Sequence, residues 1–167
     1  MKKWKTKINL RIKLAKQFIY YLMLQPYSTK DTLILIDIFN LNIPVYFALH
    51  ELDEFLSYLE IKSETYFCIY HDTKIVGGVG YDYKEEDKSG RINWIFVHPD
   101  FKEKGLGKEA VEFCIAKLKE DGRVEKLIVR TSQLAYKFFK SFDYKLLKTE
   151  KDYWATGLDL YLMEREK

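Results

Sequence analysis

An apolar strand that leads directly into a glycine-rich helix start constrains this chain more than any other segment. The run RINWIFV, residues 91–97, predicts a strand that ends before Pro99. After a short loop, Gly105-Leu106-Gly107 opens a helix that extends to about Glu120. The first amides of a helix have no partners within it, and the helix dipole adds partial positive charge there. The segment therefore predicts a cradle for an anion such as a pyrophosphate.

The composition of this loop supports an anion site but fits no nucleotide-hydrolase motif. Glycines allow the backbone to approach a ligand closely, and three lysines surround the turn: Lys102, Lys104 and Lys108. The dinucleotide fingerprint fails because Ala110 stands where it needs a glycine. The Walker motif fails because Glu109 follows Lys108 where the motif needs a serine or threonine. A bare Gly-x-Gly is also compatible with nothing more than a tight helix start.

Strands and helices alternate along the rest of the chain. Strands are predicted over residues 20–26, 65–70, 74–83, 126–131, 144–149 and 158–163. Helices are predicted over residues 33–39, 49–59 and 134–142. The β-branched residues of the first helix also permit a strand, but a capping box from Ser28 to Asp31 favours the helix. This order indicates one α/β layered domain with a mixed sheet.

The first 30 residues differ in charge from the rest. The chain has 28 basic and 25 acidic side chains, a formal charge of +3, yet residues 1–30 contain eight basic and no acidic ones. A short basic amphipathic helix fits the spacing of Ile8, Ile12, Ala15, Phe18 and Ile19. The apolar run over residues 18–24 is too short to span a bilayer, and no cleavage site follows it. We expect a solvated extension, with contact to an anionic membrane or nucleic acid as the alternative.

The composition beyond this extension narrows the class of protein. The rest of the chain is mildly acidic, which argues against a nucleic-acid partner for the domain itself. With 47 % apolar and 16 % aromatic residues, the chain can bury a sizeable core. Cys68 and Cys114 lie in apolar runs without the spacing of a disulfide framework or a zinc site. We therefore expect buried thiols, no metal and a cytoplasmic location.

Four segments together resemble one known family. The segment VHPDFKEKGLGKEAV resembles the coenzyme A loop of the GNAT superfamily of acetyltransferases, whose pattern is Gln/Arg-x-x-Gly-x-Gly/Ala. Lys102 occupies the first position, and Gly105 and Gly107 are in register; lysine keeps the charge of arginine but loses its planar fork. Further segments are similar to the family's first two helices, its later strand–helix motif and its closing strands: IFNLNIPVYFALHELDEF, TSQLAYKFFKSFDYKLL and KDYWATGLDLYLME. The resemblance covers about residues 20–165.

The resemblance implies a fold, a domain boundary and a cofactor. The fold is an α/β (α+β) domain with a mixed, mostly antiparallel central sheet, flanking helices and splayed middle strands. Residues 23–167 form the domain and residues 1–22 a basic extension. The cofactor is acetyl-CoA, whose pantetheine arm lies like an extra strand between the splayed strands. The implied contacts are Phe96 and Val97 beside the thioester and arm, the backbone of Lys102, Glu103, Lys104, Gly105, Leu106, Gly107 and Lys108 around the pyrophosphate, and Ser132, Ala135 and Phe139 along the lower arm.

The implied reaction moves an acetyl or similar acyl group from coenzyme A to a small-molecule or peptide amine. Deprotonating an amine of pKa about 10.4 at pH 7 costs roughly 4–5 kcal/mol, so a general base is expected. Glu51 is the first candidate and His50 the alternative, unless both belong only to a solvated helix start. The strand before the loop offers Asn93 and Trp94 but no carboxylate.

The chain departs from the family at the proton donor. The family's Tyr-x-x-x-Gly-Phe motif reads FKSFDY here, so Phe139 replaces the usual donor tyrosine. Tyr136, one turn earlier, and Ser132 are the candidates to replace it. Alternatively the thiolate leaves without a donor, or the chain is a coenzyme A-binding module with weak or no catalysis.

Several aromatic residues admit two interpretations. Trp94, Tyr153 and Trp154 are candidates for an acceptor pocket, although aromatic residues in strands usually belong to a core. His98 is interpreted as a turn residue beside Pro99. The aromatic strands at the C-terminus also make pairing with a second copy, a homodimer, possible.

Overall fold

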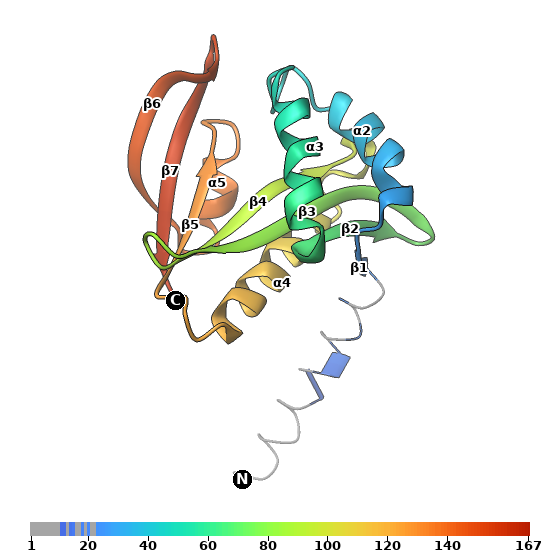
Figure 1. The fold of residues 1–167 in the computed structure, drawn as a ribbon, viewed down its shortest axis with the longest axis horizontal. Coiled ribbons are helices and arrows are strands. Elements are labelled where there is room, and N and C mark those ends of the chain that lie inside the picture. Colours follow the sequence, from blue (N-terminus) through green and yellow to red (C-terminus); the bar gives the residue numbers. More distant parts are fainter. Residues whose placement is uncertain (1–10, 13, 16–17, 19, 21–22) are drawn as a thin grey trace.

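The order of strands and helices follows the predicted alternation (Figure 1). The structure, a computed structural model, describes residues 11–12, 14–15, 18, 20 and 23–167. The strands are β1 (Leu24–Pro26), β2 (Tyr66–His71), β3 (Lys74–Lys84), β4 (Ser89–Val97), β5 (Lys126–Thr131), β6 (Lys145–Ala155) and β7 (Leu158–Glu166). The helices are α2 (Thr32–Asn40), α3 (Glu51–Lys62), α4 (Leu106–Glu120) and the short α5 (Tyr136–Lys140), with 3-10 turns at Thr29–Asp31, Ser63–Thr65 and Pro99–Phe101.

One seven-stranded sheet contains all of these strands, in the order β1-β2-β3-β4-β5-β7-β6. Neighbouring strands are antiparallel except for β4 and β5, which are parallel. A parallel pair needs a long crossover connection, and α4 lies in the segment that supplies it. The predicted mixed, mostly antiparallel sheet with flanking helices is therefore confirmed.

Helices cover both faces of the sheet, and a separate apolar cluster lies on each face. Between α2, α3 and the sheet, the rings of Phe39 and Phe55 are stacked with their centroids 5.2 Å apart, and both contact Phe96 edge-on at 5.3 Å. On the opposite face, α4 buries Val111 among residues that include Ile69 of β2. Alternate side chains of a strand point to opposite faces, so β2, β3 and β4 each contribute residues to both clusters.

Each of the two cysteines lies in one of these clusters, as the sequence predicts. Cys68 and Cys114 are free thiols and expose none of their surface. Burial, together with the nearby Asp31 carboxylate, raises the pKa of Cys68 to about 12, and burial alone raises the pKa of Cys114 further. Both are therefore protonated packing residues at neutral pH.

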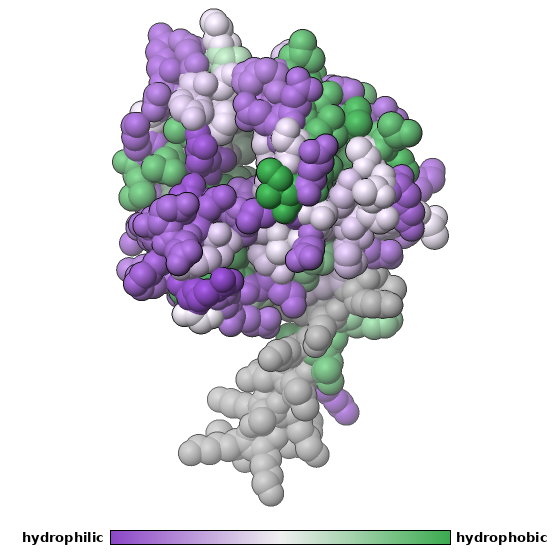
Figure 2. All heavy atoms as spheres, viewed as in Figure 1, coloured by the Kyte–Doolittle hydropathy of each residue, from purple (hydrophilic) through white to green (hydrophobic). Residues whose placement is uncertain are grey.

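The surface is apolar chiefly over α2 and the segment that follows it. Leu33, Leu41 and Leu49 are exposed there, and Figure 2 shows hydrophobic residues gathered on that side of the molecule. On the opposite side, the surface over the turn between β3 and β4 is mostly hydrophilic. No helix of the described residues is long and apolar enough to cross a membrane.

The predicted capping box from Ser28 to Asp31 is present and closes the 3-10 turn Thr29–Asp31, which leads directly into α2. The Asp31 carboxylate accepts a hydrogen bond from the Ser28 amide at 3.0 Å, and the Asp31 amide donates to the Ser28 carbonyl at 2.8 Å. Asp31 exposes only 6 % of its surface, so these hydrogen bonds are shielded from water. The cap thus decides for a helix in a segment whose β-branched residues also permit a strand.

Two predicted strand boundaries are wrong by four residues or more. The first strand begins at Leu24 rather than at Tyr20, because β2 offers antiparallel partners only to Leu24–Pro26; Tyr20 and Met23 are helical. The strand predicted to end at Thr149 continues to Ala155, where the hairpin to β7 closes. Its exposed, charged residues look like a loop in the sequence, because β6 is an edge strand with little burial on either face.

The predicted basic amphipathic helix lies mainly outside the described residues, which exclude Ile8 and Ile19. Of its other apolar positions, Ile12 and Phe18 are exposed, whereas the Tyr20 ring contacts Phe113 of α4 edge-on at 5.6 Å.

A bulge in β4 shapes the middle of the sheet. Gly78 pairs with Phe96 and Gly80 with Asn93, so the single residue Val79 faces both Trp94 and Ile95. Trp94 adopts a positive φ of 48°, a conformation that few residues with side chains take. The fully buried Tyr66 donates a hydrogen bond from its hydroxyl to the Trp94 carbonyl at 3.0 Å, which holds the bulge in place.

We predict that Gly78→Ala destabilises the protein by about 1–3 kcal/mol, because a Cβ there would overlap the Tyr66 hydroxyl that fixes the bulge. Urea unfolding measures the change. Gly122→Ala is the matched control, since nothing lies within 4 Å of a Cβ at Gly122. Equal stability of both variants would show that Tyr66 can move without cost.

Candidate functional site

The gap between β4 and β5 is the centre of the candidate site. Their parallel pairing runs from Ser89 with Lys126 to Ile92 with Val129 and stops at the bulge. Beyond that point β4 continues to Val97 and β5 to Thr131, but the described residues form no further pairs between them. The predicted splay of the middle strands is thus confirmed.

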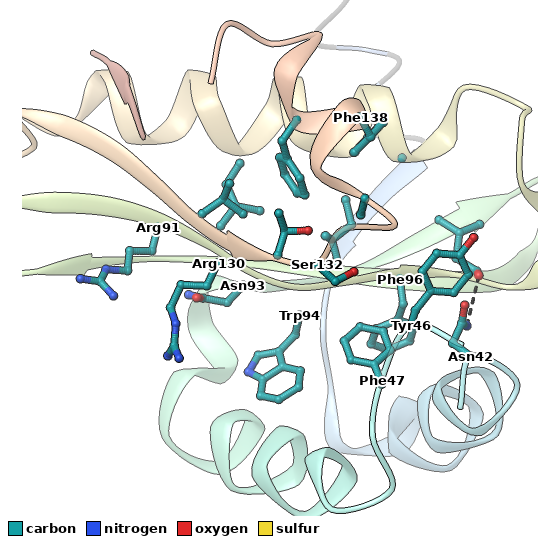
Figure 3. Close-up of a pocket in the computed structure, with 18 of the residues that line it drawn as sticks. Asn42, Tyr46, Phe47, Arg91, Asn93, Trp94, Phe96, Arg130, Ser132 and Phe138 are labelled. Carbon is teal, nitrogen blue, oxygen red and sulfur yellow. Dashed lines mark hydrogen bonds between the residues drawn. The ribbon is translucent and has the colours of Figure 1, made fainter. Parts of the chain in front are cut away.

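A cavity of about 920 Å³ passes through this gap (Figure 3). One end reaches the start of α4 and the other reaches the space beside α3. Residues of the two strands, with the residue that follows β5, line its middle: Ile92, Asn93, Trp94, Ile95, Phe96 and Val97 from β4, and Ile128, Val129, Arg130, Thr131 and Ser132 from β5 and its end. The cavity therefore connects two regions that lie on opposite faces of the sheet.

The glycine loop forms the first end of the cavity. Glu103 and Gly105 take positive φ angles of 64° and 81°, which turn the chain sharply into α4. Most of the residues predicted around the pyrophosphate line the cavity: Lys102, Glu103, Gly105, Leu106, Gly107 and Lys108. Lys104 does not line it, and its ammonium lies 4.9 Å from the ring centre of Phe101 instead.

Lys102, which stands at the family's Gln/Arg position, is oriented by an aromatic ring. Its ammonium lies 3.8 Å from the ring centre of Tyr46, a cation–π contact that holds the charge at the rim of the cavity. This contact replaces part of the orientation that the planar fork of an arginine would provide.

The middle of the cavity exposes main-chain groups of β4. The His98 amide donates to the Val76 carbonyl at 2.7 Å, so by alternation Val97 turns its amide away from β3 and towards the gap. The Val97 carbonyl accepts a hydrogen bond from the Asn42 side chain at 3.3 Å (Figure 3), and Asn42 is itself fixed to the Ile38 carbonyl at 2.9 Å. A main-chain amide that faces the gap, as the Val97 amide does, is what an extended ligand arm requires.

The residues predicted beside the lower arm also line the cavity. Ser132, Ala135 and Phe139 lie at its wall. The Ser132 hydroxyl accepts a hydrogen bond from the Leu134 amide at 3.3 Å, which leaves its proton free to donate. Phe139 exposes 2 % of its surface and packs edge-on against Tyr144 at 5.9 Å. A ring in this position supplies apolar wall but no proton.

Glu51 lies at the second end of the cavity and exposes only 4 % of its surface. Its carboxylate accepts a hydrogen bond from the Ala48 amide at 2.7 Å at the start of α3. Burial raises the pKa of Glu51, and this effect outweighs the opposing hydrogen bond. A buried carboxylate of raised pKa in a cavity is the setting of many general bases. The alternative candidate, His50, is exposed beside Glu54 and does not line the cavity.

The remaining aromatic candidates divide between cavity and packing. Trp94 and Trp154 line the cavity, and the Trp154 indole donates to the Thr131 carbonyl at 3.3 Å. Tyr136 does not line it, because its ring packs on Tyr161 with the centroids 5.0 Å apart. The His98 ring accepts from the Asp100 amide at 3.2 Å, the turn role predicted for it.

Several residues at the second end were not singled out by the sequence. Asp82 exposes 5 % of its surface and binds Asn93 at 3.1 Å and the Lys84 ammonium at 3.0 Å. The Tyr58 hydroxyl is buried and has no hydrogen-bond partner among the described residues, while burial and the Asp82 charge raise its pKa. In the sequence, the signal for Asp82 is a single acidic residue within the mostly apolar β3 segment. No comparable pattern marks Tyr58.

Comparison with known protein families identifies the family to which the chain belongs. The model of the acetyltransferase (GNAT) family matches residues 35–144. This range covers β2 to β5, and with them the splayed strands and the glycine loop. The chain therefore belongs to the GNAT family and is an acetyltransferase. No curated protein matches the chain.

Solved structures share the fold at low identity. Ribosomal-protein-alanine N-acetyltransferase from Brucella melitensis is 16 % identical with a TM-score of 0.68, over 87 % of this chain and 100 % of that one. Naa50 from Arabidopsis thaliana, in complex with the bisubstrate analogue CoA-Ac-MVNAL, is 16 % identical with a TM-score of 0.70, over 86 % and 97 %. The yncA protein from Salmonella typhimurium with its cofactor acetyl-CoA is 13 % identical with a TM-score of 0.68, over 86 % and 92 %.

We predict that Gly107→Glu folds but loses coenzyme A binding. A Cβ at Gly107 would lie 3.6 Å from Phe138, an ordinary contact, whereas a carboxylate there would face the expected pyrophosphate. Like charges in contact cost several kcal/mol, so affinity should fall roughly a hundredfold or more.

The measurement is the rise in melting temperature with coenzyme A. Gly122→Glu adds the same side chain beyond the far end of α4 and is the control. Equal ligand stabilisation of both variants would contradict a pyrophosphate site at the loop.

Proposed function

We propose that this acetyltransferase moves an acetyl group from acetyl-CoA to an amine. The observation that carries the proposal is the continuous cavity, which joins the glycine loop to the buried Glu51 carboxylate through the gap between β4 and β5. Such a cavity allows an acyl donor and an acceptor to approach from opposite faces of the sheet and meet at the bulge.

The residues present fit coenzyme A. The amides at the start of α4, with Lys102 and Lys108, would bind the pyrophosphate. The main-chain edge at Val97 would pair with the pantetheine arm, and Ser132 and Ala135 would flank it. Bound acetyl-CoA supplies an activated acyl thioester. In the Phe96–Val97 region, the Val97 amide faces the gap and would be the main-chain donor for a thioester carbonyl there.

The amine must lose its proton before it can attack, and Glu51 is the proposed base. Its pKa is raised, so the Glu51 carboxylate is a better proton acceptor than the carboxylate of an exposed glutamate would be. Asp82 is the other buried acid at this end, but Lys84 and Asn93 already engage its two oxygens. Among the residues that the structure describes, the Glu51 carboxylate accepts a hydrogen bond from Ala48 alone, which leaves it freer to accept a proton directly or through water.

Two hydroxyls remain candidates to protonate the departing thiolate. Ser132 lines the cavity with its own proton uncommitted, whereas the Tyr136 ring packs against Tyr161. The geometry therefore favours Ser132 over Tyr136. Departure of the thiolate without a donor is compatible with Phe139 at the usual tyrosine position.

We predict that Glu51→Gln lowers kcat for amine acetylation roughly a hundredfold or more, because it removes the proton acceptor and leaves an oxygen for the Ala48 amide. Thiol release from acetyl-CoA with a panel of amines measures the rate. Glu60→Gln, on the exposed face of the same helix, is the control. Thiol release that no amine accelerates would contradict acetyl transfer and leave a coenzyme A-binding module.

The same substitution has a predicted effect on stability. Because the folded-state pKa of Glu51 is raised above its unfolded value, ionisation of this group weakens the fold as pH rises through that pKa. Glu51→Gln should remove this pH dependence and melt at an equal or higher temperature than the unaltered protein above neutral pH. A lower melting temperature would mean that the charge itself is needed for the cap.

We also propose that residues 23–167 form the domain and that it pairs with a second copy. The first strand of the sheet starts at Leu24, which supports a boundary near Met23. Leu146 and Leu147 are exposed on β6, at an edge of the sheet, where a second copy would cover them. The two buried, free thiols support a reducing compartment, the cytoplasm, as the location.

We predict that the chain from Met23 onward folds, sediments as a dimer and binds coenzyme A as the full chain does. Loss of the Tyr20 contact with Phe113 should cost about 0.5–1.5 kcal/mol of stability. Sedimentation equilibrium and ligand-dependent melting test this. Failure to fold would place the boundary earlier, and a monomer would remove the proposed pairing.

A further inference from the structure

Arg130 stands out among the charged residues at the second end of the cavity. It lies on β5 just beyond the point where β4 and β5 part. Figure 3 shows its side chain projecting on the same side of the sheet as Asn93 and Trp94, towards α3. Its guanidinium is exposed in the open cavity rather than buried under the sheet.

Neighbouring cations at this end are already neutralised. The Lys84 ammonium binds Asp82 at 3.0 Å, and the Arg91 guanidinium binds Asp87 at 2.9 Å. Arg130 has no carboxylate within 4.0 Å among the described residues. Lys62 also lines the cavity, but it lies in the last turn of α3, where its charge offsets the helix dipole. Arg130 is thus the strongest uncompensated anion-binding group beside the proposed base.

Aromatic rings hold this guanidinium in place. Its central carbon lies 5.0 Å from the ring centres of both Tyr153 and Trp154, and one nitrogen donates to the Tyr153 hydroxyl. These contacts leave most of the donor fork unused, since a guanidinium carries five N–H groups. An arginine held against rings loses less freedom when it binds an anion than a mobile one does.

The hairpin that carries the two rings is itself fastened to the turn after β5. The Gln133 side chain donates to the Gly157 carbonyl at 2.6 Å and accepts from the Asp159 amide at 2.9 Å. The Trp154 indole donates to the Thr131 carbonyl at 3.3 Å, next to Arg130 in sequence. Three segments therefore fix the position of Arg130: β5, the turn after β5 and the hairpin between β6 and β7.

Groups of opposite charge line the same end of the cavity, Glu51 on α3 and Arg130 on β5. Arg130 is close enough to Glu51 that its charge lowers the pKa of that carboxyl, the smallest of the contributions that act on it. When the ammonium of an acceptor approaches Glu51, the Arg130 guanidinium lies at the same end of the cavity.

We propose that the acceptor amine is a small molecule that also carries a carboxylate, and that Arg130 binds this carboxylate while the amine points to the bulge at Trp94. The inference rests on the proposed function and names its substrate class as amino-acid-like. Arg130 acts here as a specificity-determining residue, because it fixes the acceptor without taking part in the proton transfer.

The experiment compares the standard L-amino acids with their primary carboxamides as acceptors, at saturating acetyl-CoA. We expect at least one amino acid to be acetylated with a KM about tenfold to a hundredfold below that of its carboxamide, the range of one charge-assisted pair. Arg130→Gln should raise the KM of the acid by a similar factor, with little change in kcat or in the KM of the carboxamide. Arg130→Lys should retain part of the preference.

Arg123→Gln, at an exposed pair with Asp121 far from the cavity lining, is the matched control. A carboxamide that reacts as well as its acid, or a preference that survives Arg130→Gln, would overturn the inference while leaving acetyl transfer intact. Absence of reaction with both sets would overturn the proposed function itself. If Arg130→Gln does not fold, the acid-to-carboxamide ratio of the unaltered protein and of Arg130→Lys decides.

Discussion

The hydrogen bond from the Tyr66 hydroxyl to the Trp94 carbonyl is the interaction on which the site depends. It stabilises a residue with positive φ in the middle of a strand and so keeps the extra residue of β4 in a bulge. The bulge bends β4 away from β5, because a strand with one residue out of register cannot continue the same ladder. The gap opened in this way joins the two faces of an otherwise continuous sheet.

The two ends of the cavity then differ in chemistry because different elements form them. The start of α4, two lysines and the positive φ angles of the loop favour a polyanion. At the other end, α3, β3 and β5 bring together carboxylates, a guanidinium and the buried phenol of Tyr58. An acyl donor and an acceptor with both charges can therefore approach one point without competing for the same groups.

The sequence predicts the local features well and the long-range ones poorly. Gly105 and Gly107 are recognisable because their function depends on backbone conformation within a few residues. Leu24–Pro26 and Lys145–Ala155 were misjudged at their ends because strand length depends on partners that are distant in sequence. Glu51 was selected from its position alone, and its burial comes from tertiary packing that the local pattern does not contain.

Arg130 and Tyr58 illustrate the limit most clearly. Each lies in a segment with ordinary periodicity, and each gains its meaning from neighbours on other elements: the rings of Tyr153 and Trp154 for Arg130, and the buried Asp82 for Tyr58. Tyr136 shows the converse, since one helical turn from Phe139 is enough to direct its ring onto Tyr161 instead of into the cavity. A tyrosine one helical turn from the family's donor position thus does not place its hydroxyl in the cavity.

The most direct test is the experimental structure of the chain with coenzyme A. We expect the pyrophosphate against the amides at the start of α4, the arm in the gap between β4 and β5, and the thiol beside Trp94 facing Glu51 and Arg130. Coenzyme A bound outside the gap, or a gap closed by continued pairing of β4 with β5 beyond Ile92, would contradict the two-ended site.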